Sequence, residues 1–83
     1  RLNAQGKIIR IDYFDENAER ALIAEAIEEF GVKINILHGR IEFIKKKPVG
    51  VLYISLNGDP DNTRDALKFI RDNAGKTEVI RDA

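Results

Sequence analysis

Short runs in which hydrophobic residues alternate with polar ones recur along the chain, and such runs predict β-strands. Four of them cover residues 7–14, 33–45, 49–56 and 77–80. Alternation also assigns side chains to faces, because successive residues of a strand point to opposite sides. The first run would place Ile9, Ile11 and Tyr13 on one face. The third run would place Leu52, Ile54 and Leu56 opposite Val51, Tyr53 and Ser55.

The second run is interrupted by His38 and Gly39. A glycine inside a strand often marks a bulge or a close approach of another segment. Before the interruption, Ile34 and Ile36 would face one way, and Asn35 and Leu37 the other. A short polar turn at residues 46–48 would join this run to the third one as a hairpin.

Two further segments have hydrophobic residues three and four positions apart, which predicts amphipathic helices. The first begins at about Ala18 after the cap candidates Asp15, Glu16 and Asn17, and it would bury Leu22, Ile23, Ala26, Ile27 and Phe30. Gly31 follows, where a left-handed helix end favours glycine. The second begins with an acidic cap and a proline at Asp59-Pro60. It would bury Ala66, Leu67, Ile70 and Ala74 and end at Gly75.

The order strand, helix, strand, strand, helix, strand predicts an α+β fold, the ferredoxin-like βαββαβ plait. Its four-stranded antiparallel sheet would carry both helices on one face. Residues 1–83 would form a single domain with an ordered core at about 7–81. The other face would carry the apolar side chains of Leu37, Val51 and Tyr53, and such a surface usually meets a partner, a ligand or a second copy.

Composition narrows the function classes. The 83 residues include 14 basic and 14 acidic ones, and this neutral balance argues against nucleic-acid binding. The absence of cysteine from the sequence excludes disulfides and cysteine metal sites. No apolar run approaches the roughly 20 residues that span a bilayer. The chain begins at Arg1 rather than Met, from which we expect a fragment of a longer protein.

Residues typical of catalysis do not form a recognisable pattern. His38 is the only histidine, which is a poor basis for a catalytic triad or a metal site, although it could contact a ligand. The carboxylates lie mostly on predicted helix faces. We therefore expect no catalytic residue, metal or cofactor, and a chain that is not an enzyme by itself. The basic run Lys45–Lys47 suits a solvated turn, with contact to an anionic lipid or phosphate as the alternative.

Asn35 is the one polar residue in an otherwise apolar strand segment. Its carboxamide offers two donors and an acceptor. It could hold both charged ends of an amino acid, or it could satisfy a backbone group at a strand edge, and its spacing alone leaves both roles open.

The stretch Asn35-Ile36-Leu37, followed by Gly39 and Ile41, resembles the signature that names the NIL domain. The resemblance extends over about residues 8–80, through residues 30–32, 49–52, 66–70 and 79–80. NIL domains stand at the C-terminus of ATP-binding subunits of methionine-importing ABC transporters, and also beside iron–sulfur modules in some ferredoxin-like proteins. This chain is similar to the transporter branch. The alternative is an amino-acid-binding or dimerisation module of another NIL-containing protein.

The resemblance implies an ACT-like regulatory domain that pairs with a second copy as a homodimer and binds methionine near the interface. When filled, it would hold the two ATPases apart and slow import. The family's ligand-binding asparagine maps onto Asn35, and the matching positions Ile36, Leu37, His38 and Gly39 would line the pocket. His38 departs from the small residue common there. The implied partners are the transporter's ATPase and membrane subunits, and the implied location is the cytoplasmic side of the cell membrane.

Overall fold

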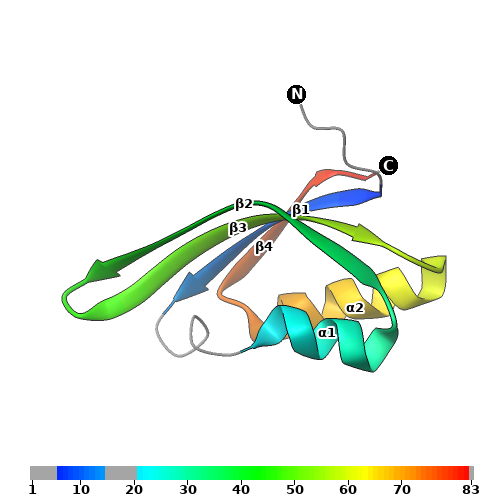
Figure 1. The fold of residues 1–83 in the computed structure, drawn as a ribbon, viewed down its shortest axis with the longest axis horizontal. Helices are drawn as coiled ribbons and strands as arrows, with labels where there is room; N and C mark the ends of the chain where they lie inside the picture. Colours follow the sequence, from blue (N-terminus) through cyan, green and yellow to red (C-terminus); the bar gives the residue numbers. More distant parts are fainter. Residues whose placement is uncertain (1–5, 15–20, 83) are drawn as a thin grey trace.

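The computed structural model describes residues 6–14 and 21–82 of the chain. A single antiparallel sheet has the strand order β2-β3-β1-β4, and both helices cover the same face of it (Figure 1). This confirms the predicted ferredoxin-like plait. The elements are β1 (Lys7–Phe14), α1 (Leu22–Phe30), β2 (Lys33–Ile44), β3 (Lys47–Asn57), α2 (Pro60–Asn73) and β4 (Lys76–Arg81).

The hydrophobic core lies between the sheet and the two helices. The predicted strand faces are confirmed, because alternate residues of β1 and β3 point into this core. Ile70 and Ala66 of α2 and Leu22 of α1 cover them from the other side, and Phe30 meets Phe69 with 5.5 Å between ring centroids. Burying each large aliphatic side chain contributes about 1.5–3 kcal/mol, so these layers supply most of the stability.

Helix α1 ends as predicted and differs from the prediction along its flank. Gly31 has a left-handed φ of 64°, and its N–H donates to the carbonyl of Ile27. Ile27 itself was expected to be buried, but its side chain is 40% exposed. It lies outside the stripe centred on Leu22 and Ala26, which face the sheet. The predicted cap candidates and the start at Ala18 fall within residues 15–20, outside the described residues.

Helix α2 begins at its predicted cap. The carboxylate of Asp59 accepts hydrogen bonds from the backbone N–H groups of Asp61 and Asn62. At the other end the helix stops at Asn73, and Ala74, expected inside it, is an extended C-cap residue. Gly75 lies beyond that cap and donates its N–H to the carbonyl of Asp12 at 2.9 Å. It therefore joins α2 to the end of β1.

The hairpin between β2 and β3 turns one residue earlier than predicted. Lys45 and Lys46 form the turn with positive φ angles of 53° and 68°. Two left-handed residues match the twist of the flanking strands in a two-residue loop. Lys47 and Pro48, expected in the turn, already belong to β3.

Candidate functional site

Asn35 lies on β2, which forms one edge of the described sheet. It is opposite Ser55 of β3, and its Nδ2 donates to Ser55 Oγ at 3.4 Å. Ser55 alternates with Ile54 and Leu56, which point into the core, so Asn35 and Ser55 share the face without helices, called the open face below. A distance of 3.4 Å is long for an N–H···O bond. The carboxamide is therefore weakly held and can meet a ligand.

A bulge in β2 separates the five site residues that the sequence predicts. The pairing of β2 with β3 shifts between Ile36 and His38, so Leu37 has no partner residue on β3. After the shift, His38 lies opposite Tyr53 on the open face. Without the bulge, strict alternation would have placed His38 on the helix-covered face. The predicted interruption of this strand is thus a real bulge, at Leu37.

Two of the predicted site residues belong to the other side of the sheet. Gly39 lies opposite Leu52, and a Cβ added to Gly39 would stand 2.6 Å from Leu52 Cδ2. This is the close approach that the glycine predicted. Ile36 lies opposite Ile54 and is 60% exposed. A single copy therefore does not gather Asn35, His38, Ile36 and Gly39 in one pocket, and they meet only along the edge of β2.

The open face is not the apolar surface that the sequence suggested. Val51 and Tyr53 lie on it, as predicted, and are half-buried. Their neighbours in register, however, are Arg10 and Asp12 of β1 and Arg40 of β2. Alternation in β3 correctly predicted which of its own side chains lie on the open face. The side chains next to them come from β1 and β2, and which strands flank β3 does not follow from that alternation.

These polar side chains surround the ring of Tyr53. The guanidinium carbon of Arg10 lies 5.8 Å from the centroid of that ring, and the His38 ring centroid lies 6.2 Å from it. Arg10 Nε donates to Asp12 Oδ1 at 3.1 Å, and this hydrogen bond raises the pKa of Arg10. A hollow of about 240 Å³ lies among Arg10, His38, Arg40, Val51 and Tyr53. Both guanidinium groups already have a carboxylate partner, because Arg40 Nε lies 3.1 Å from Glu42 Oε2. A ligand carboxylate at this hollow would bind through their remaining N–H groups.

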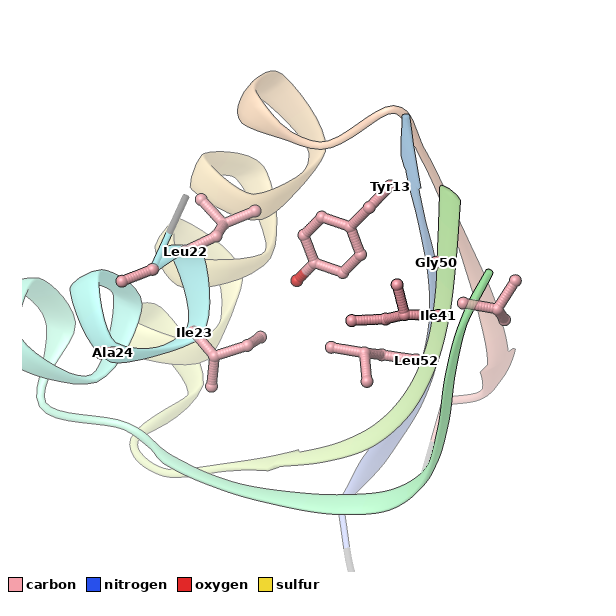
Figure 2. A pocket seen from close by; sticks show the side chains of 9 residues that line it. Tyr13, Leu22, Ile23, Ala24, Ile41, Gly50 and Leu52 are labelled. Carbon is pink, nitrogen blue, oxygen red and sulfur yellow. The ribbon is translucent and has the colours of Figure 1, made fainter. Parts of the chain in front are cut away.

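A second hollow, which sequence reasoning missed, lies on the helix-covered face between α1 and the β2–β3 hairpin (Figure 2). Its volume is about 170 Å³, and its walls include Tyr13, Leu22, Ile23, Ile41, Gly50 and Leu52. The sequence feature that could have indicated this hollow is Gly50, which lies opposite Ile41 in the hairpin. A glycine inside a strand leaves space where a neighbour would have a side chain.

The described ranges, 6–14 and 21–82, offer neither a metal site nor a membrane-spanning helix. Within them, no group of three His, Asp or Glu side chains could hold a metal ion. No helix there has the length and apolar character needed to cross a bilayer. The interactions that these side chains offer are hydrogen bonding at Asn35, contact with an anion at Arg10 and apolar contact in the hollow beside Tyr13, called the Tyr13 cavity below.

The sequence model of the NIL domain matches residues 7–79. The chain belongs to the NIL domain family. This confirms the resemblance drawn from the stretch at residues 35–41. The signature residues Asn35, Ile36 and Leu37 lie in the first half of the exposed edge strand β2.

Relatives of this NIL domain are parts of larger proteins. The methionine import ATP-binding protein MetN of Bacillus subtilis is 39% identical over 93% of the chain, which spans 23% of that protein. MetN 2 of Shouchella clausii is 34% identical over 93% of the chain and 23% of its own length. A crystal structure, the C-terminal domain of an ABC transporter ATP-binding protein from Enterococcus faecalis, superposes with a TM-score of 0.76. It is 31% identical and covers 95% of this chain and 88% of that one. The chain thus spans about a quarter of the curated relatives it matches.

Proposed function

We propose that this NIL domain is the regulatory part of a methionine-importing ABC ATPase subunit. It binds methionine from the cytosol at Asn35, next to a second copy, and when filled it holds the two ATPases apart so that import slows. The observation that carries the proposal is the 39% identity to a methionine import ATP-binding protein over 93% of the chain. In the parent protein the domain would lie on the cytoplasmic side of the membrane, attached through the ATPase to the membrane subunits.

The polar groups of the open face suit the charged end of an amino acid. The Asn35 carboxamide has two donors and an acceptor, which can meet a carboxylate and an ammonium group. Further along β2, His38 lies on the same face as Asn35, and the hollow beside it is also lined by Arg10 and Arg40. A charge-assisted hydrogen bond is about twice as strong as a neutral one. This supports an amino-acid ligand whose carboxylate turns toward the remaining N–H groups of Arg10 and Arg40.

The distribution of the site residues supports a site shared between two copies. Asn35 and His38 lie on one face of β2, and Ile36 and Gly39 on the other, so a molecule seated along the strand edge can reach both sets. In one copy the apolar Ile36 is 60% exposed. A methionine side chain needs an apolar and adaptable wall. A second copy placed along β2 would complete such a wall.

Inhibition requires that methionine favour one arrangement of the ATPases. A ligand shifts an equilibrium only by the difference between its affinities for the two states. Methionine would have to bind more tightly when the paired domains keep the ATPases separated than when ATP closes them. Equal affinity for both arrangements would leave import unchanged.

The test is calorimetry of the chain with methionine and with the other amino acids. We expect selective binding of methionine. Asn35→Ala should weaken that binding tenfold or more, because it removes a hydrogen bond to a charged group worth about 1.5–3 kcal/mol. The fold should remain intact, since Asn35 is exposed. Asn62→Ala, on the exposed surface of α2, is the matched control and should bind methionine like the parent.

Two results would count against the proposal in different ways. Full methionine affinity in the Asn35→Ala variant would remove Asn35 from the site and leave the ligand in place. If neither the parent chain nor the Asn62→Ala control binds any amino acid, methionine is not the ligand of this domain.

A further inference from the structure

We propose that the cavity between α1 and the β2–β3 hairpin is a second binding site. Its ligand is a small neutral molecule that is apolar over most of its surface and carries one hydrogen-bonding group. The site is separate from the one at Asn35.

The described walls of this hollow are apolar, and the hollow is partly open to solvent. They come from the end of β1, the first turn of α1 and the facing parts of β2 and β3, and none of the described lining residues carries a charge. The volume is about 170 Å³. Apolar cavities of about 150 Å³ can take up molecules of the size of benzene. The size and the described lining therefore fit a compact organic molecule.

The hydroxyl of Tyr13 is the polar group of the cavity. Figure 2 shows the ring between the sheet and α1, with its oxygen directed into the space beside Ile23 and Leu22. Tyr13 is only 7% exposed, and within residues 6–14 and 21–82 its hydroxyl has no hydrogen-bond partner. A ligand hydroxyl, carbonyl or amide could form a hydrogen bond with it.

The protonation of Tyr13 is compatible with this role. Burial raises the pKa of Tyr13 to about 12. The phenol therefore stays neutral at ordinary pH and keeps its proton for donation. It does not bring a charge into the cavity, which again favours a neutral ligand.

The cavity differs in chemistry and position from the site at Asn35. The charged ends of an amino acid need fixed polar or charged groups, and the lining offers none besides the Tyr13 hydroxyl and the backbone. Asn35 lies on the open face, whereas the cavity lies on the helix-covered face. Ile41, a wall of the cavity on β2, is 61% exposed. An occupant would cover Ile41 and connect the hairpin to α1.

The experiment is a titration of the isotopically labelled chain with phenol, followed by NMR of the methyl groups. We expect the signals of Ile23, Ile41 and Leu52 to shift and the amide of Asn35 to stay in place. Benzene should shift the same methyl groups. Tyr13→Phe should weaken phenol binding about fivefold through the lost hydrogen bond, and it should leave benzene binding unchanged.

Two substitutions on one helix provide the steric control. Ile23→Phe should fill the cavity and abolish binding of both probes without lowering the melting temperature, because it replaces empty space by contacts. Ile27→Phe makes the same change one turn along, away from the cavity, and should bind both probes normally. The proposal is wrong if phenol shifts no cavity methyl, if Tyr13→Phe affects both probes equally, or if methionine displaces phenol. None of these results depends on whether methionine binds at Asn35.

Discussion

Two glycines that follow helices in this chain serve different physical purposes. Gly31 has a left-handed φ of 64°, and a Cβ there would meet nothing within 4 Å. Gly75 has no positive φ, but a Cβ there would overlap the ring of Phe14 and stand 2.8 Å from the carbonyl oxygen of Asp12. The first glycine is needed for its backbone conformation, and the second because β1 and the end of α2 lie in close contact.

This difference predicts unequal losses of stability. Gly75→Ala should lower the free energy of unfolding by about 3 kcal/mol, because the methyl group would overlap the ring of Phe14 and lie 2.8 Å from the backbone carbonyl oxygen of Asp12, so the backbone must shift. Gly31→Ala should cost about 1 kcal/mol, the price of a left-handed alanine. Urea denaturation of both variants checks the prediction. Equal losses would show that contact with Phe14 does not constrain Gly75.

At the scale of single elements, the β2–β3 hairpin contains strain that its sequence does not relieve. Lys45 and Lys46 both have positive φ angles, where two-residue hairpin turns favour Asn-Gly. A left-handed residue other than glycine costs about 1–2 kcal/mol. The turn is nevertheless formed, because the strands on either side pair along most of their length.

Glycine should therefore have opposite effects at neighbouring positions of this hairpin. Lys46→Gly should raise the free energy of unfolding by about 0.5–1 kcal/mol, since it removes the left-handed cost and adds a smaller chain-entropy cost. Lys47→Gly, one residue into β3, should lower it by a similar amount because it only adds flexibility. Thermal unfolding of the two variants tests this. A loss of stability in both would mean that the turn is not strained.

At the scale of the whole molecule, the sheet has two unequal edges. The edge at β4 is short, whereas β2 is long and carries apolar side chains that remain exposed. These are Ile36, Ile41, Phe43 and Ile44. An exposed and apolar edge strand is a surface on which another chain can pair. The asymmetry indicates that a second copy would approach along β2.

We accordingly expect the chain to associate through β2. Ile36→Lys should shift it toward the monomer in sedimentation equilibrium, since a lysine on an edge strand opposes pairing. Ile80→Lys places the same charge on β4, where the original side chain is 48% exposed, and should leave association unchanged. A parent chain that is monomeric at high concentration, or an equal effect of both substitutions, would contradict pairing through β2.

The outcome of sequence reasoning differed between local and non-local features. The cap at Asp59, the left-handed Gly31 and the alternation of β1 were predictable, because each depends on residues within a few positions of one another. The exposure of Ile27 was not, because the width of a buried stripe depends on how α1 sits on the sheet. The Tyr13 cavity was not predictable either, since its walls come from four separate elements.

The sequence by itself determined the order of elements, the family and the presence of a polar residue, Asn35, in an apolar strand. Periodicity, capping and turn chemistry are short-range properties and can be followed along the chain. Only the tertiary structure decided that Arg10 and Arg40 flank β3, and that the bulge at Leu37 returns His38 to the open face. Strand neighbours and register arise from contacts between distant segments, and a shift of one residue exchanges the two faces of a strand.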